Sequence, residues 1–300
     1  MQIQLIRRAM LRLEYVGHTF VIDPYLAPKH TRPSLAGKSP NPLVDLPCPP
    51  LEVIAGIEND IMTIAALPAH PHILEIGCGT SQATMPLAQR GYQLMCLDIG
   101  AALLAIAQYK FTCFPNVHFH HVAFEDWPAQ PDMFDLVMSA TAIHWIDPEV
   151  GYPKAAYVLK DTGSLAIFSN EHYPFAAEFA EDLQGIEQRI VPESAEPPSD
   201  PDLDAAIAAR VGTIDATRLF TMVIVKKYPW SQTYSTTEHL RLLNTCSNYR
   251  NLEQQRRTQL FQAIADLIDH KYSGTITKSY LAVLYLALVS DDFCMIACAR

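Results

Sequence analysis

Hydrophobic and polar residues alternate along most of this chain in blocks that predict a regular succession of strands and helices. Short apolar runs predict strands at residues 72–76, 93–97, 117–122, 134–139, 164–169, 222–228 and 276–288. Segments with helical periodicity predict helices at residues 54–67, 82–91, 101–111, 149–160, 203–217, 237–244 and 252–271. Strands that alternate with helices in this way indicate a parallel sheet covered on both faces, which is an α/β fold.

The first sixty residues have a different pattern. Residues 3–13 and 15–23 predict two strands of a hairpin. A proline-rich segment with little periodicity follows at residues 24–50. Such a segment is typical of a surface loop, because buried backbone without regular hydrogen bonds is costly.

Composition and charge narrow the possible functions. The chain has 300 residues, of which 49% are hydrophobic and 18% are charged, as in an ordinary folded protein. The formal net charge is −10. Because binding through phosphates needs a basic surface, this balance argues against a nucleic-acid partner and leaves small molecules and proteins.

Cysteine usage and the apolar runs indicate a cellular compartment. Seven scattered cysteines without a C-x-x-C pair suggest reduced thiols in a cytosol. The start of the chain shows no continuous apolar run of the secretory type. The longest apolar stretch near the end of the chain, at residues 280–289, is too short to span a bilayer. We therefore expect a soluble, cytoplasmic protein with no membrane contact. No pattern indicates its oligomeric state.

The richest motif follows the first α/β strand and reads Glu75-Ile76-Gly77-Cys78-Gly79-Thr80. Glycines at this place allow a tight turn and a close backbone approach to a nucleotide-like ligand. A dinucleotide fingerprint would need a third glycine at its sixth position, where the chain has Gln82.

Residues after the next strands favour a different nucleotide-like cofactor. Asp98 ends the second strand about twenty residues further on, where a carboxylate can accept hydrogen bonds from ribose hydroxyls. Phe124 and Glu125 follow the third strand, where an apolar residue beside an acid can hold an adenine. The run Phe134-Asp135-Leu136-Val137 then opens the fourth strand.

With these motifs together, residues 59–288 resemble the class I S-adenosylmethionine-dependent methyltransferases, in particular the type 11 group that includes trans-aconitate methyltransferase-like proteins. The resemblance implies a Rossmann-like, doubly wound sheet of seven strands with the last strand antiparallel, a C-terminal helical cap and S-adenosylmethionine as cofactor. It places the methionine part against Glu75, Gly77, Cys78 and Gly79, the ribose against Asp98, and the adenine against Phe124 and Glu125. It also implies that Ser139 closes the pocket at the end of strand four.

Two features concern catalysis. The family usually has glycine directly after the threonine, where this chain has Ser81, and a side chain there could crowd the turn. His144, just past the fourth strand, is the candidate catalytic base, because imidazole titrates near neutrality. The alternative is that His144 packs and shapes the pocket. His118, His120 and His121 alternate along a strand without carboxylate or thiolate neighbours, so we expect no metal.

Residues 1–57 resemble a truncated front piece of a metallo-β-lactamase-fold hydrolase, because the predicted hairpin ends in Ile22-Asp23-Pro24-Tyr25-Leu26. The metal motif H-x-H-x-D-H of that family is absent from the segment after it, so hydrolase chemistry is not expected. We expect a non-functional N-terminal fragment at 1–57, a methyltransferase domain at 58–290 and a tail at 291–300.

The sequence therefore predicts a methyltransferase that uses S-adenosylmethionine and acts on a small-molecule acceptor, either a carboxylate or a hydroxyl. The alternative is a catalytically impaired protein of the same fold that binds only the cofactor or a protein partner. Ser81 and a short cap before the first α/β strand motivate this alternative. Nothing in the sequence names the acceptor.

Overall fold

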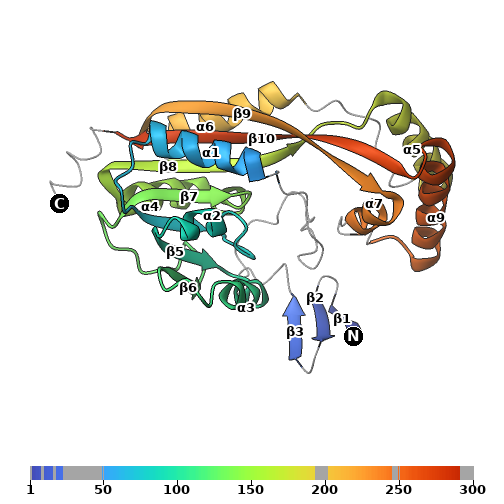
Figure 1. Cartoon of the computed structure of the whole chain (residues 1–300), viewed down its shortest axis with the longest axis horizontal. Helices are drawn as coiled ribbons and strands as arrows, with labels where there is room; N and C mark the ends of the chain where they lie inside the picture. The colour runs from blue at the N-terminus through green and yellow to red at the C-terminus, as the bar shows by residue number, and fades with distance from the viewer. Residues whose placement is uncertain are drawn as a thin grey trace.

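A mixed seven-stranded sheet forms the centre of the protein (Figure 1). The computed structural model describes residues 2–7, 10–15, 18–22, 49, 51–192, 202–244, 249 and 251–290, with backbone alone for residues 2–22. The strands of the central sheet are β4 (His72–Ile76), β5 (Gln93–Asp98), β6 (Val117–His121), β7 (Phe134–Ala140), β8 (Leu159–His172), β9 (Phe220–Ser235) and β10 (Thr275–Val289).

The strand order is β6-β5-β4-β7-β8-β10-β9. Strands β4 to β8 pair in parallel, and β10 runs antiparallel to both β8 and β9. The predicted α/β sheet of seven strands with its last strand antiparallel is therefore confirmed. From β4 the chain adds β5 and β6 on one side of the sheet, and from β7 it adds β8 on the other side. Ligands of open α/β sheets bind at such a switch point, here between β4 and β7.

Helices cover both faces of this sheet. One face carries α1 (Leu51–Ile64), α2 (Thr84–Gln89) and α3 (Ala101–Lys110), and the other carries α4 (Pro148–Val158) and α6 (Leu203–Ala216). Successive strand residues point to opposite faces: Ile73 joins the first cluster and Leu74 the second, both fully buried. Near-continuous apolar strands are what a sheet covered on both sides requires.

The last two strands are longer than predicted and form an extended hairpin, paired from Thr275 with Ser235 to Val289 with Phe220. The pattern 222–228 marked only part of β9, because this edge strand contains Pro229 and exposed lysines. Both are tolerated at a sheet edge, where one row of backbone groups has no partner strand.

At the far end of this hairpin, away from α2 and α3, the described residues form α5 (Ala177–Ile190), α7 (Thr236–Leu243) and α9 (Gln254–Lys271) (Figure 1). Helix α5 was not predicted, although Phe179, Leu183 and Ile186 give it a buried stripe at helical spacing. Its apolar residues belong to the same core cluster as those of α1 and α2. The predicted C-terminal helical cap is therefore continuous with the main core.

The N-terminal segment forms three strands, so the prediction of a two-stranded hairpin was wrong. They are β1 (Gln2–Arg7), β2 (Met10–Tyr15) and β3 (His18–Ile22), in a sheet of their own with antiparallel pairing. The pattern of apolar and polar residues runs through residues 3–13 without a break, so it did not separate β1 from β2. The predicted domain division stays a prediction, and α1 runs continuously through its boundary at 57/58. The tail at 291–300 lies outside the described residues.

Candidate cofactor and acceptor site

The glycine turn lies at the carboxyl end of β4 and is attached to β5. Gly77 and Cys78 donate backbone hydrogen bonds to the Leu97 carbonyl oxygen, at 2.8 and 3.1 Å. Gly77 has φ +70°, and a Cβ there would lie 2.3 Å from the Cβ of Ala142. Only glycine fits this position, because the loop after β7 passes directly against it.

Gly79 differs from Gly77 because its side is open. It has φ +55°, and within the described residues no heavy atom beyond its two chain neighbours lies within 4 Å of where its Cβ would be. A positive φ favours glycine, and the open space leaves room for a ligand to approach the backbone. The turn thus presents one tightly packed glycine and one accessible glycine.

Asp98, at the end of β5, links the loop that follows β4 to the loop that follows β5. Its Oδ2 accepts from the Gly79 N–H at 2.7 Å, and its Oδ1 accepts from the Gly100 N–H at 2.6 Å. The residue is 9% exposed. A carboxylate offers about four lone-pair sites, so two hydrogen bonds leave capacity for the hydroxyls of a ribose.

Ser81 follows the turn in a left-handed conformation, with φ +63°. It is 2% exposed, and within the described residues its Oγ has no hydrogen-bond partner. Its backbone N–H donates to the Cys78 carbonyl at 2.8 Å and closes the turn. The position therefore requires a positive φ, which is the physical reason for the glycine that the resemblance led us to expect.

Glu75 lies beneath the turn, only 1% exposed. Its Oε2 accepts from the Thr84 hydroxyl at 2.5 Å, with the Cys96 thiol at 3.8 Å. Burial raises the pKa of Glu75 to about 7, although the hydrogen bonds from Thr84 and Cys96 oppose this. The predicted contact of Glu75 with the methionine part stays a prediction.

The two buried thiols in this region are in contact. Cys78 is 6% exposed and Cys96 is fully buried. A hydrogen bond with Cys78, together with burial, raises the pKa of Cys96. Both side chains thus belong to the packed underside of the turn, and the assignment of Cys78 to cofactor binding stays a prediction that rests on its backbone.

Ser139 lies in β7, the strand beside the turn, and His144 follows that strand in the chain. Ser139 is fully buried and donates to the Ile76 carbonyl oxygen at 3.1 Å, which joins the ends of β7 and β4. His144 lies in the short helix η1 (Ile143–Trp145) with an exposed face. Desolvation by neighbouring atoms and the Arg210 guanidinium lower the pKa of His144, and Glu171 opposes them.

Phe124 and Glu125 differ in exposure. Phe124 is 3% exposed and stacks on Trp127, with ring centroids 6.4 Å apart. Lys154 holds this loop by donating to the carbonyl oxygens of Glu125 and Trp127, at 2.8 and 2.5 Å. The Glu125 side chain is exposed. The Glu125 side chain is therefore accessible and the Phe124 ring is packed, and the predicted contact of both residues with an adenine stays a prediction.

Sequence reasoning missed three residues. Ile99, directly after Asp98, is 58% exposed, although large apolar side chains are usually covered. An exposed apolar residue beside Asp98 suits the face of a base, and its position next to this acid was a signal that the sequence offered. Arg210 on α6 and Glu171 on β8 approach His144 from distant parts of the chain, and no local pattern could have placed them there.

The predicted site residues thus meet at one edge of the sheet, at the carboxyl ends of β4, β5, β6 and β7. A family profile described as "Methyltransferase domain" matches residues 73–163, which contain all of them. Residues 73–163 of the chain therefore match a methyltransferase domain. The predicted family is thereby confirmed.

Individual relatives agree with this methyltransferase assignment. A malonyl-[acyl-carrier protein] O-methyltransferase of Marinomonas sp. is 31% identical over 99 residues, which are 32% of this chain and 37% of the relative. A trans-aconitate 2-methyltransferase of Deinococcus radiodurans is 25% identical over 167 residues, which are 52% of this chain and 64% of the relative. The chain thus spans less than two thirds of the length of these relatives.

Solved structures share the methyltransferase fold. A protein of Anaeromyxobacter dehalogenans assigned as a type II methyltransferase superposes with a TM-score of 0.57 and 16% identity, covering 80% of this chain and 96% of that one. The resemblance of residues 1–57 to a metallo-β-lactamase-fold hydrolase is not borne out, because the family match begins only at residue 73.

In the described part of the chain, none of the helices is both long and apolar enough to cross a membrane. Over the same ranges, no three His, Cys, Asp or Glu side chains come together as a set that could hold a metal ion.

Proposed function

We propose that this protein transfers a methyl group from S-adenosylmethionine to an acidic small molecule, with an acceptor carboxylate as nucleophile. The observation that carries the proposal is the pairing of Gly79 with Asp98 across the ends of β4 and β5. It combines an open glycine with a carboxylate that has unused lone pairs. These are the two features that a nucleoside with a charged tail needs.

The residues present fit this cofactor. The open side of Gly79 would receive the methionine part, Asp98 the ribose hydroxyls, and Ile99 and Glu125 the adenine. Glu75 and Ser139 would support the turn from below, because both are buried: Glu75 accepts a hydrogen bond from Thr84 at the start of α2, and Ser139 donates one to Ile76 at the end of β4. When bound, the cofactor supplies an activated methyl group on a sulfonium.

The acceptor side is built around His144. Burial and the Arg210 cation lower the pKa of its imidazole, so His144 is neutral at physiological pH. Arg210 comes from α6 and Glu171 from β8, and Glu171 is already held by the Ser169 hydroxyl at 2.6 Å. Arg210 is therefore the cation on this side that suits a carboxylate, since guanidinium binds it in a bidentate manner.

A carboxylate acceptor also agrees with the chemistry of the site. It is ionised at neutral pH and needs no base to attack a methyl group, so catalysis rests on orientation. His144 then acts by shaping the acceptor side, which is the packing alternative of the sequence prediction. The malonyl and trans-aconitate groups in the names of two relatives both carry carboxylates, which supports this acceptor class.

The test is methyl transfer from labelled S-adenosylmethionine to a panel of di- and tricarboxylic acids, with matched alcohols and amines as controls. We expect label in methyl esters only. Arg210→Gln should raise KM for the acid by about tenfold or more, the worth of one charge-assisted pair, and leave cofactor affinity unchanged. Arg210→Lys, which keeps the charge, should lose less.

Two outcomes contradict this proposal. Transfer to alcohols or amines in preference to acids would overturn the acceptor class. Cofactor binding without transfer to any acceptor would favour the alternative of a protein that only binds.

A further inference from the structure

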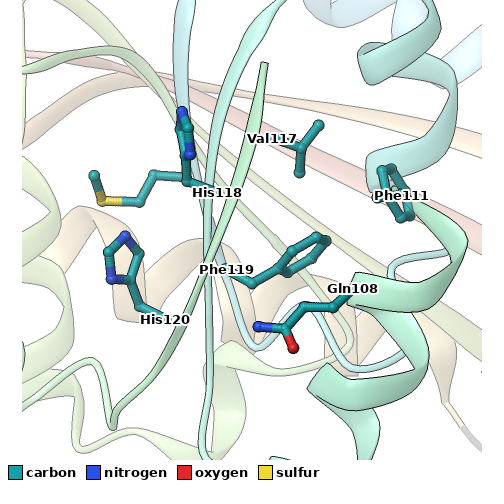
Figure 2. Close-up of a pocket in the computed structure, with 7 residues that line it drawn as sticks. Gln108, Phe111, Val117, His118, Phe119 and His120 are labelled. Atoms are coloured by element: carbon teal, nitrogen blue, oxygen red, sulfur yellow. The ribbon is translucent and has the colours of Figure 1, made fainter. Parts of the chain in front are cut away.

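A groove at the outer edge of the sheet carries two histidines that the cofactor site does not use (Figure 2). It has a volume of about 420 Å³ and lies along β6, the edge strand. His118 and His120 of β6 line it, and both are exposed. Neither belongs to the turn, to Asp98 or to the acceptor side.

The two histidines point the same way. They are two residues apart on one strand, so their side chains leave the same face. Figure 2 shows both imidazoles on one side of β6 and Phe119 on the other side, toward Phe111 and Gln108 of the α3 region. Phe119 packs on Phe111 with ring centroids 5.5 Å apart, which fixes the strand and hence the direction of both histidines.

A third donor comes from the neighbouring strand. In the parallel register of β5 and β6, Met95 is the partner of His118, and Leu97 is the partner of His120. Directly paired residues point to the same face, so the Met95 thioether projects beside the His118 imidazole. Met95 lines the same groove and is partly exposed.

The chemistry of this donor set selects a metal. Two imidazoles suit zinc, nickel and copper, whereas a thioether is a soft ligand that favours copper. Copper(II) also stands highest in the general affinity order of divalent first-row metals. Among the described residues that line the groove, none carries a carboxylate or a thiolate, the ligands that would favour calcium, magnesium or a closed zinc site.

We propose that His118, His120 and Met95 form a copper-binding site on the edge strand, separate from the methyl-transfer site. The sequence analysis predicted no metal here, because the histidines have no carboxylate or thiolate neighbours in the chain around them. The sheet register supplies a third donor, Met95, from 23 and 25 positions away. The ion would be held at the surface, with water completing its coordination.

The experiment is a titration of copper(II) into the full-length protein, followed by calorimetry and electron paramagnetic resonance, after blocking of accessible thiols with N-ethylmaleimide. This step removes the exposed Cys113 as a competitor. We expect one copper per chain in a spectrum with nitrogen hyperfine coupling. His118→Gln and His120→Gln should each weaken binding by about tenfold or more, as loss of a ligand does.

A matched control and a second probe separate this site from general binding by histidines. His121→Gln removes an exposed histidine of the same strand whose ring is held by the Ile99 carbonyl, and it should leave copper affinity unchanged. Met95→Leu keeps the size of the side chain and should weaken copper(I) more than copper(II), measured by competition with a copper(I) indicator.

Three results would overturn the proposal. The first is unchanged copper affinity in the variant that lacks both His118 and His120. The second is an equal loss in His121→Gln, and the third is zinc(II) binding as tight as that of copper. Circular dichroism of each variant confirms that it is folded, so that lost binding cannot come from lost structure.

Discussion

Ser81 shows how one residue can conflict with the conformation that its position requires. It is a non-glycine residue at φ +63°, and its buried hydroxyl has no hydrogen-bond partner among the described residues. A left-handed conformation costs a residue with a Cβ roughly 1 kcal/mol, and an unpaired buried hydroxyl costs roughly 1–3 kcal/mol. The methyltransferase turn is thus folded at the expense of local strain.

Substitution of this residue tests that strain. Ser81→Gly should raise the free energy of unfolding by about 1 kcal/mol, because it removes both costs and adds only some unfolded-state entropy. Ser81→Ala is the matched control: it removes the hydroxyl but keeps the strained φ, so its gain should be smaller. Urea denaturation followed by circular dichroism measures both. A Ser81→Gly protein less stable than the wild type would show that the hydroxyl makes a favourable contact.

The motifs in the sequence predicted which residues lie together at the edge of the sheet, but not the directions in which their side chains point. Gly77, Gly79, Asp98 and Ser139 lie together as expected, because the ends of adjacent parallel strands meet at one edge of the sheet. The motif could not show that Glu75 faces Thr84. The direction of a side chain depends on packing from helices that lie elsewhere in the sequence.

At the scale of elements, α7 carries a buried histidine in an aromatic environment. His239 is fully buried near Phe175, Phe179 and Tyr234, and neither of its ring nitrogens has a hydrogen-bond partner among the described residues. Burial, and secondarily Lys278, lowers its pKa to about 4. The neutral form of His239 is therefore the one that packs from α7 against Phe179 of α5 and Tyr234 of β9.

His239 and Glu75 should affect stability in opposite directions over nearly the same pH range. Between about pH 4 and 6.5 the unfolded state binds a proton at His239 that the folded state does not, so stability rises with pH. Between about pH 4.5 and 7 the folded state holds a proton on Glu75 that the unfolded state loses, so stability falls with pH. Each slope is about 1.4 kcal/mol per pH unit, so the two nearly cancel.

Single variants separate these slopes. His239→Phe should leave a free energy of unfolding that falls as pH rises from 4.5 to 6.5, and Glu75→Gln should leave one that rises. Other titrating groups are common to both proteins, so the difference between the two profiles isolates this pair. Urea unfolding at several pH values measures it. Parallel profiles for the two variants would contradict the assignment of both protonation states.

Element prediction failed where an edge or a distant partner decides the structure. Strand β9 was only partly marked, because Pro229 and its lysines are tolerated at the sheet edge. Helix α5 was not predicted, because part of what holds it comes from a distant segment. Its Asp182 accepts hydrogen bonds at 2.6 Å from Lys271 and Tyr272, at the end of α9. Those contacts join segments about ninety residues apart, which no local window can contain.

At the scale of the whole molecule, the strand order determines where chemistry can occur. The order places β4 and β7 side by side, with the glycine turn after β4, His144 after β7 and Asp98 at the end of the neighbouring β5. Regular strand–helix alternation predicted this architecture, because it leaves few ways to cover both faces of a parallel sheet. The long hairpin and its three helices extend the same core away from this edge (Figure 1).

The proposed S-adenosylmethionine site depends on the Gly79–Asp98 pair, and calorimetric titration of the cofactor tests whether this site is competent. We expect one cofactor per chain. Asp98→Asn should weaken the affinity by about tenfold or more, the worth of a lost charge-assisted hydrogen bond. Asp161→Asn, an exposed acid at the start of β8, should bind as the wild type does. No heat of binding, or equal affinity in Asp98→Asn, would contradict the account.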